Sequence, residues 1–293
     1  MIHPLALAAV LGAGASLLAV ARPVACLDAL ATAALAVGGF RSRRMPAATG
    51  TLHWLERSGG TPAVVLLHGL GASAERWFPI LPGFLGGRRL LVPSLPAHGR
   101  SSAPRQPFGV VEVARWMGEW TDRMIPAGGA DLIGFSMGGW IAAHMVLQRP
   151  ERVRRLILAS SAGVRLDPPP ARRLLAPETV EDVRNLVEIL TVRPLPLPGF
   201  VLRDLLRRAR PERRWLVESA LRGEGLLEDS LERIRQPTLV VWGKEDRLIP
   251  PEAGRRLAAG IRGARVVEME GCGHLPYWER RAEFRRVVEA FLA

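Results

Sequence analysis

Residues 131–140 have the sequence DLIGFSMGGW, which places Ser136 between glycines where a short apolar strand runs into a helix. A serine at so sharp a turn takes a strained backbone conformation, and side chains two residues to either side would collide. Gly134 and Gly138 are therefore required as elbow glycines, because glycine has no side chain to clash. The stretch predicts a nucleophile elbow from which Ser136 projects alone.

The composition indicates a folded α/β protein rather than a disordered chain. With 293 residues and 48% hydrophobic content, the chain can form one large α/β domain with an appendage. The net charge of +12 comes almost wholly from arginine, since Lys244 is the only lysine. These arginines are scattered and no nucleic-acid-binding motif accompanies them, so nucleic acid is not an expected partner. Two cysteines, Cys26 and Cys272, are too few for a disulfide scaffold.

The amino-terminal segment is unusually apolar. Residues 4–21 and 29–40 contain no charged side chain. A helix over the first run would span about 27 Å, which is close to the thickness of the hydrocarbon core of a bilayer. We therefore predict that residues 1–44 are a membrane-anchor segment, with residues 4–40 forming one span or a hairpin of two. The alternative is that these residues form helices that pack on the rest of the protein or on a partner.

Charge next to the apolar runs predicts where the following domain lies. Arg41, Arg43 and Arg44 follow the second run directly. By the positive-inside rule they would stay on the cytoplasmic side of a bacterial inner membrane, and the domain behind them would stay there too. A soluble cytoplasmic protein is the alternative.

Buried strands alternate with helices along the rest of the chain. Ala63–Leu67 is a continuous apolar run, which is typical of a strand covered on both faces of a parallel sheet, and Arg89–Val92 and Val153–Ala159 are predicted to be further strands. Between them, Val110–Met124 has apolar residues at helical spacing. This alternation predicts a parallel sheet with helices on both faces. Thr51–Arg57 alternates apolar and polar residues and predicts an edge strand.

The pattern changes between residues 164 and 235. Prolines there break short helices such as Glu178–Leu190 and Val201–Arg210. We predict that this segment is a helical cap inserted into a core made of residues 45–163 and 236–293. The arginines of the cap alternate with apolar residues, so they form a solvated face or, alternatively, a lid on an acidic lipid surface.

A glycine-bearing loop follows the first buried strand, at residues 68–71 (HGLG). Such a loop can aim a backbone N–H group at a reacting carbonyl oxygen, and Leu70 is placed to do so. With the N–H group of Met137 it would complete an oxyanion hole. His68 precedes the loop, a position that suits a structural hydrogen bond better than the role of a base.

A carboxylate and a histidine follow two later strands. After the strand Pro237–Trp242, three acidic residues compete, and Asp246 is preferred because it falls at the end of the turn. Glu245 is expected to point outward, and Glu252 begins the next helix. His274 lies in a glycine-rich loop after the last strand, from which its imidazole could reach Ser136.

The order serine, acid, histidine is the order in which α/β-hydrolases carry their catalytic residues. From residue 52 to residue 292 the chain resembles a serine esterase or lipase of that superfamily. Four stretches carry the resemblance: HGLG at 68–71, GFSMGG at 134–139, VWGKED at 241–246 and GCGH at 271–274. The apolar amino terminus, the small cap and the Ser-Met-Gly-Gly elbow are most similar to membrane-anchored monoacylglycerol lipases.

Two residues depart from the family pattern. Ser94 stands where relatives usually carry aspartate, and Ala97 stands where they carry glycine. Both lie in a turn, so the departures bear on the subfamily rather than on catalysis.

The resemblance implies an α/β-hydrolase fold, with a mostly parallel sheet flanked by helices, and a two-step hydrolysis. His274 would take the proton of Ser136, and Asp246 would hold the imidazole in the correct tautomer. Leu70 and Met137 would bind the oxyanion. Neither a metal nor an organic cofactor is required. The implied substrate is a small-molecule ester or a lipid with an apolar acyl chain, monoacylglycerols included.

Two alternatives stay open. Carbon-carbon bond hydrolases of ring-cleavage pathways keep the elbow serine and are the nearest enzymatic alternative. A membrane-tethered hydrolase-like protein that binds a partner without turnover is the second. Haloalkane dehalogenases and epoxide hydrolases are disfavoured, because they carry aspartate where this chain has Ser136.

Overall fold

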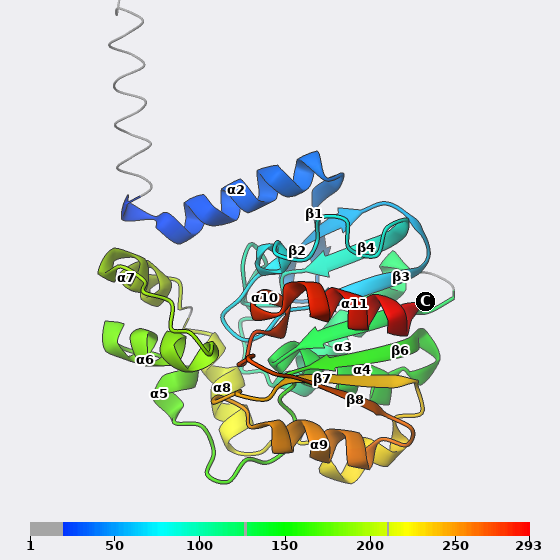
Figure 1. Ribbon diagram of the computed structural model, residues 1–293. Coiled ribbons are helices and arrows are strands. Elements are labelled where there is room, and N and C mark those ends of the chain that lie inside the picture. The colour runs from blue at the N-terminus through cyan, green and yellow to red at the C-terminus, as the bar shows by residue number, and fades with distance from the viewer. Residues whose placement is uncertain (1–19, 126–127, 210) are drawn as a thin grey trace, which may run out of the picture.

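The computed structural model describes residues 20–125, 128–209 and 211–293. These residues form an eight-stranded sheet in the order β1-β2-β4-β3-β5-β6-β7-β8 (Figure 1). Strands β3 to β8 run parallel, and β1 and β2 are antiparallel to their neighbours. The strands are β1 (Phe40–Ala47), β2 (Gly50–Arg57), β3 (Gly60–Leu67), β4 (Arg88–Pro93), β5 (Ala130–Phe135), β6 (Val153–Ala159), β7 (Thr238–Gly243) and β8 (Arg265–Met269).

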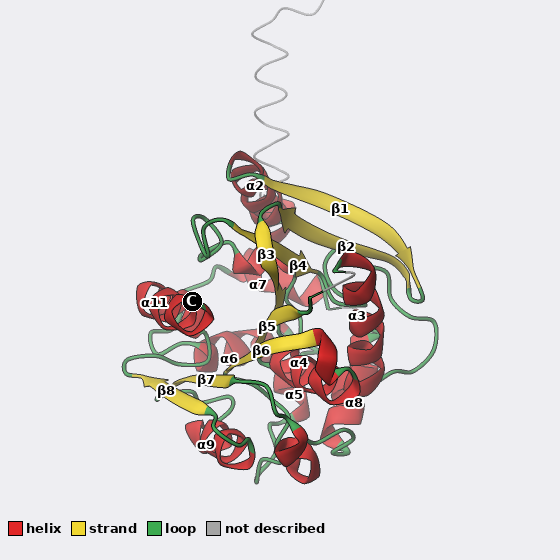
Figure 2. Cartoon of the chain, turned by 90° about the vertical axis from the view of Figure 1, so that its right-hand side faces the viewer, coloured by secondary structure: helices red, strands yellow, loops and turns green. Residues whose placement is uncertain are grey.

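Helices cover both faces of this sheet, as the continuous apolar strands predict. Along β3, Val65 and Leu67 join the apolar cluster that contains the helices α3, α4 and α9. Val64 and Leu66 point the other way, into the cluster with α11. Figure 2 shows α11 on one side of the sheet and α3 and α4 on the other. The prediction of a parallel sheet buried on both faces is therefore confirmed.

The helices of the core follow the strands in sequence. They are α3 (Val110–Met124), α4 (Met137–Gln148), α9 (Pro251–Gly260), α10 (Pro276–Glu279) and α11 (Arg281–Leu292), with the short 3₁₀ helices η1 (Ala74–Trp77) and η2 (Pro150–Arg152). A third 3₁₀ helix, η3 (Glu228–Arg233), precedes β7.

The edge of the sheet differs from the sequence prediction. Thr51–Arg57 is predicted to be the edge strand, but β2 lies between β4 and β1, and β1 forms the edge. Most residues of β1 are exposed or half-buried, and three of them are arginines. An edge strand with this composition has no apolar alternation, which is why the sequence does not reveal it.

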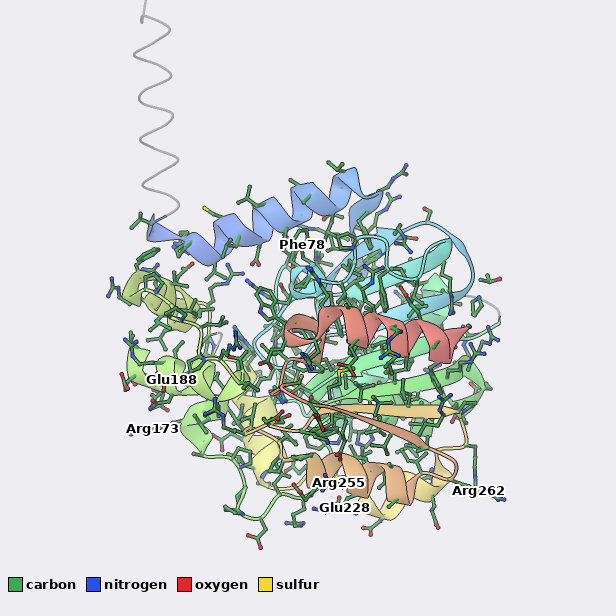
Figure 3. The ribbon with its side chains drawn as sticks, in the orientation of Figure 1. Phe78, Arg173, Glu188, Glu228, Arg255 and Arg262 are labelled. Carbon is green, nitrogen blue, oxygen red and sulfur yellow. The ribbon has the colours of Figure 1, made fainter. Side chains whose placement is uncertain are left out.

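In the described part of the segment 164–235, four α-helices precede η3 between β6 and β7. They are α5 (Arg172–Leu175), α6 (Val180–Leu190), α7 (Gly199–Arg207) and α8 (Arg213–Leu221). Figure 3 shows Arg173 and Glu188 on this part of the chain, and both side chains are exposed. Other arginines of the segment make ion pairs, such as Arg172 with Glu178 and Glu218. We call this group of helices the cap.

The amino-terminal part of the described chain is a helix, α2 (Pro23–Val37), which packs on the protein body. Val24 and Leu35 of this helix are buried against the rest of the protein. Of the predicted apolar runs, residues 4–19 lie outside the described residues, whereas residues 29–40 form the second half of α2 and the start of β1. Within the described ranges, no helix combines the length and hydropathy that a membrane span needs.

Candidate active site

Ser136 lies on the turn between β5 and α4, with φ 54° and ψ −123°. A positive φ is uncommon for a residue with a side chain, and it marks stored backbone strain. Close packing explains the flanking glycines. A methyl group at Gly134 would lie 2.4 Å from the carbonyl oxygen of Gly138, and one at Gly138 would lie 2.3 Å from that of Leu67. Only glycine fits either position without a backbone shift.

His274 and Asp246 reach Ser136 from two loops far along the chain. Nε2 of His274 lies 3.1 Å from Oγ of Ser136. Nδ1 of the same ring lies 2.8 Å from Oδ2 of Asp246. Both side chains are almost fully buried, at 2% and 0% exposure. We call Ser136, His274 and Asp246 the candidate triad, because a serine, an imidazole and a carboxylate joined in this order can activate the serine.

The surrounding backbone fixes the carboxylate of Asp246. Its Oδ1 accepts hydrogen bonds from the N–H groups of Leu248 and Ile249, each at 2.9 Å. Oδ2 is thereby left facing His274. Of the three acidic residues that competed in the sequence, Glu252 pairs instead with Arg255. The structure thus brings Asp246, and neither Glu245 nor Glu252, to the imidazole.

Glu245 is exposed as predicted, but its carboxylate has a partner that the sequence does not reveal. It accepts the N–H groups of Gly271 at 3.2 Å and Cys272 at 2.9 Å. These residues begin the loop that carries His274. Glu245 therefore ties the loop after β7 to the loop after β8.

Glu279 binds the histidine loop from its other side. One carboxylate oxygen accepts the N–H group of Gly273 at 2.7 Å, and the other accepts that of Val192, just beyond α6 of the cap, also at 2.7 Å. The N–H group of His274 donates to the carbonyl oxygen of Leu190 at 2.9 Å. The cap thus contacts the histidine loop directly. Sequence reasoning missed Glu279, and its position five residues after His274 is the one local signal.

The loop after β3 passes beside the serine. A methyl group at Gly69 would lie 3.1 Å from Cβ of Ser136. The backbone of Leu70, the next residue, therefore lies close to the elbow. Met137 is the first residue of α4, where helical N–H groups have no partner within the helix. Both residues that were expected to donate to an oxyanion are thus next to Ser136. We call residues 68–73 the oxyanion loop.

His68 has the structural role that its position suggests. Its Nδ1 lies 2.8 Å from the carbonyl oxygen of Gly69, and its Nε2 accepts the N–H group of Leu95 at 3.0 Å. The side chain is buried, and burial lowers the pKa of the imidazole to about 4. A neutral ring with both nitrogens occupied holds the oxyanion loop in place.

The turn with the two departures from the family pattern is well packed. Oγ of Ser94 accepts the N–H group of Ala74 at 3.2 Å. Ala97 has φ 64°, in the left-handed region that favours glycine. The turn therefore keeps a glycine-like conformation although the residue is alanine.

A mostly parallel sheet, an elbow serine and the order serine, acid, histidine define the class of α/β-hydrolases. The chain belongs to the alpha/beta hydrolase family, whose model matches residues 64–287. It is a hydrolase of that family.

Relatives of different activities share this fold. The chain is 30% identical over 265 residues to a 2-hydroxy-6-oxononadienedioate/2-hydroxy-6-oxononatrienedioate hydrolase of Klebsiella pneumoniae subsp. pneumoniae, with 83% of this chain and 91% of the relative covered. It is 29% identical to a protein described as a membrane phospholipase A, a bacterial virulence factor, with 98% of this chain and 96% of that chain covered and a TM-score of 0.80.

A meta-cleavage product hydrolase from Pseudomonas fluorescens has a TM-score of 0.75, with 23% identity, and the match covers 85% of this chain and 97% of that chain. At that identity the likeness concerns the fold alone.

Proposed function

We propose that the protein is a serine hydrolase that cleaves carboxylic esters of apolar acyl chains through an acyl-enzyme. The observation that carries this proposal is the hydrogen-bonded chain from Asp246 through His274 to Oγ of Ser136. These hydrogen bonds link a buried carboxylate to a hydroxyl on a strained turn, which is the arrangement that nucleophilic acyl transfer needs.

The geometry supports the following sequence of steps. Nε2 of His274 takes the proton of Ser136 as Oγ bonds to the ester carbonyl carbon. The carboxylate of Asp246 stabilises the imidazolium that forms. The N–H groups of Leu70 and Met137 bind the oxyanion, and one such donor contributes about 3 to 4 kcal/mol. The carbon–oxygen bond to the alcohol then breaks, and the alcohol leaves with the proton from His274.

Water completes the cycle. The same imidazole takes a proton from a water molecule as the water oxygen attacks the acyl carbon. The second oxyanion collapses, the acid leaves, and the proton returns to Oγ of Ser136. Ester and water are consumed, alcohol and acid are formed, and no other reactant takes part.

The extent of the similarity favours an ester over a carbon-carbon bond. The match to the membrane phospholipase A covers 98% of the chain, so it includes most of the amino-terminal segment. The matching structure of the meta-cleavage product hydrolase covers 85% of the chain. Phospholipases A act on carboxylic esters of lipids, so the more extensive similarity supports a lipid-like ester as substrate.

We also propose that residues 4–40 associate with a membrane, with the core on the cytoplasmic side. The outer face of α2 is apolar, since Leu27, Leu30 and Val37 are 54%, 66% and 92% exposed. In the sequence, α2 follows the uncharged run of residues 4–21, with Arg22 between them. The arginines of β1 follow directly and can interact with anionic headgroups.

The proposal of membrane association has a direct test. A variant that lacks residues 1–19 but keeps α2 is expected to move from the membrane fraction toward the soluble fraction. Leu30→Glu in that background should complete the shift. A distribution unchanged by both alterations would refute the association.

Carbon-carbon bond hydrolysis is the second candidate function, and one contact favours it. Nη1 of Arg213, from α8 of the cap, would lie 3.4 Å from a methyl group at Gly71 in the oxyanion loop. The dienedioate named for the Klebsiella relative is a dicarboxylate, and a guanidinium can bind a carboxylate in two parallel hydrogen bonds.

A substrate panel separates these candidates from each other and from a non-catalytic binding protein. The panel comprises p-nitrophenyl esters from C2 to C16, monoacylglycerols and a vinylogous diketone with a terminal carboxylate. Turnover of the esters above the diketone is expected, with a maximum at medium or long chains. Preferential turnover of the diketone, lost in Arg213→Gln, would replace the ester proposal. No turnover of any substrate by folded protein would favour the binding protein.

A further inference from the structure

Helix α2 bridges the cap and the core (Figure 1). Near its amino-terminal end, the N–H group of Val24 donates to Oδ2 of Asp204 on α7, at 3.0 Å. Asp204 is only 1% exposed. Further along the helix, Oγ1 of Thr32 accepts a hydrogen bond from Arg100 of the core at 3.0 Å. The helix is therefore fixed to both parts of the molecule by polar contacts.

Asp28 lies between these two contacts and joins the core to the cap with one carboxylate. Its Oδ1 binds Nη2 of Arg76 at 2.6 Å, and its Oδ2 binds Nη2 of Arg208 at 2.5 Å. The side chain of Asp28 is 11% exposed, so both ion pairs are partly shielded from solvent. Arg76 belongs to the core helix η1, and Arg208 directly follows α7 of the cap.

Arg76 connects Asp28 to the elbow. Helix η1 begins directly after the oxyanion loop. Its last residue, Trp77, is buried and packs its ring against Phe135, with the ring centroids 6.5 Å apart. Phe135 precedes Ser136, and its ring is centred 5.0 Å from that of His274. A displacement of η1 would therefore shift Trp77 and Phe135, and through their packed rings it would change the position of His274.

Arg208 connects Asp28 to the other side of the oxyanion loop. Its carbonyl oxygen accepts a hydrogen bond from Nη2 of Arg213. The other terminal nitrogen of Arg213 lies against Gly71, as described above. The oxyanion loop thus lies between η1, which follows it directly, and Arg213 of the cap, and both sides connect to Asp28.

We propose that Asp28 is a positioning residue, which sets the oxyanion loop and the cap in their working arrangement by binding Arg76 and Arg208 together. The proposal rests on the proposed serine hydrolase function. It implies that the amino-terminal helix is part of the working enzyme, so that a change in the seating of α2 alters catalysis without a contact to substrate.

The chain offers a control residue for this proposal. Asp122 on α3 also binds two arginines, Arg149 and Arg152. Its ion pairs join α3 to residues after α4, away from the cap. Asp28→Asn and Asp122→Asn therefore each remove one negative charge and two ion pairs with arginine, although the carboxylate of Asp122 is more exposed, at 31% against 11%.

The kinetic test compares these two variants on p-nitrophenyl acetate and p-nitrophenyl octanoate. Asp28→Asn is expected to lower kcat/KM about 10- to 100-fold, the range that a displacement of about 1 Å can cost. Asp122→Asn should stay within about twofold of wild type, because its arginine partners lie beyond the far end of α4 from Ser136 and contact no residue of the candidate triad. If Asp28→Asn does not fold, Arg76→Gln and Arg208→Gln replace it. Arg76→Gln is expected to lower kcat, and Arg208→Gln is expected to raise KM for the octanoate.

A structural measurement keeps this proposal separate from the proposed function. Hydrogen exchange should become faster in peptides of both η1 and α7 in Asp28→Asn, and in neither of them in Asp122→Asn. If the wild type hydrolyses no ester, the proposed function fails while the exchange data still decide whether Asp28 joins the two elements. If the wild type is active and Asp28→Asn matches Asp122→Asn in kinetics and exchange, the role of Asp28 is refuted.

Discussion

Replacing Asp246 with asparagine removes one charge and keeps the shape of the side chain, and the nearby hydrogen bonds dictate how the new amide must lie. Oδ1 of Asp246 accepts two backbone N–H groups, from Leu248 and Ile249. Because backbone N–H groups only donate, the amide oxygen of the asparagine must occupy this position. Its NH₂ group must then face Nδ1 of His274, where the carboxylate oxygen lies in the wild type.

The consequence falls on the proton of Ser136. A donor facing Nδ1 forces the neutral imidazole to carry its hydrogen on Nε2, which is the nitrogen 3.1 Å from Oγ. In that tautomer His274 cannot accept the proton of the serine. We expect kcat to fall about 10,000-fold, which is about 5.4 kcal/mol of transition-state stabilisation. The loss of unfolding free energy should be only about 1 to 2 kcal/mol, because both backbone hydrogen bonds remain.

The assay is steady-state hydrolysis of a p-nitrophenyl ester, with thermal unfolding followed in parallel. Glu245→Gln is the matched control, since this neighbouring residue also accepts two backbone N–H groups but does not contact His274. We expect it to retain at least about a tenth of the wild-type kcat, since it acts only through the position of the loop. An Asp246→Asn protein that is folded and keeps more than about a tenth of wild-type kcat would refute the tautomer argument.

Three further predictions concern stability and reactivity. Gly138→Ala should lower the melting temperature by several degrees and abolish hydrolysis, because the new methyl group would lie 2.3 Å from a backbone carbonyl oxygen. Gly86→Ala is the control and should do neither, because a methyl group there would have no heavy atom within 4 Å. Calorimetry of both variants checks this, and equal melting temperatures would contradict it. The pKa of His68 is lowered from 6.5 to about 4, so the native state binds fewer protons than the unfolded state in this interval. The contribution of His68 to the free energy of unfolding should therefore be fully present above pH 6.5 and should decrease by roughly 3 kcal/mol as the pH falls to 4. Urea unfolding of wild type and His68→Gln should show a smaller loss in the variant, and parallel pH profiles would refute the assignment. The thiol of Cys272 is buried, and burial raises its pKa to about 12, so a thiol reagent should modify Cys26 in the native protein and Cys272 only on unfolding. Labelling of Cys272 at native conditions, seen by mass spectrometry of its peptide, would show that the loop opens.

The strands and the elbow are predictable from sequence because their signals are local. A strand buried on both faces must be apolar along its whole length, and Ala63–Leu67 meets this requirement with side chains at most 3% exposed. Gly134 and Gly138 are needed because the backbone packs closely around the single turn that carries Ser136. Asp246 and His274 follow strands directly, so their place at one edge of the sheet follows from the parallel topology.

Contacts between distant segments leave no such signal. Asp28 is one of two charged residues between the apolar runs, with Arg22, and its partners lie 48 and 180 residues along the chain. Glu245 and Glu279 accept hydrogen bonds from backbone N–H groups of loops. Because almost every residue has such a group, the sequence does not show which ones a glutamate will bind. Strand β1 is charged and lies at an edge, so it lacks the alternation by which β2 is found.

The central claim is that the hydroxyl of Ser136 is a nucleophile activated by His274, and covalent labelling tests it most directly. The full-length protein is incubated with a serine-directed fluorophosphonate, and the modified peptide is identified by mass spectrometry. We predict that the peptide containing Ser136 is labelled in the wild type and in Ser58→Ala, which alters an exposed serine. Ser136→Ala should show no labelling. Equal labelling of wild type and Ser136→Ala, or none in folded wild type, would contradict the claim.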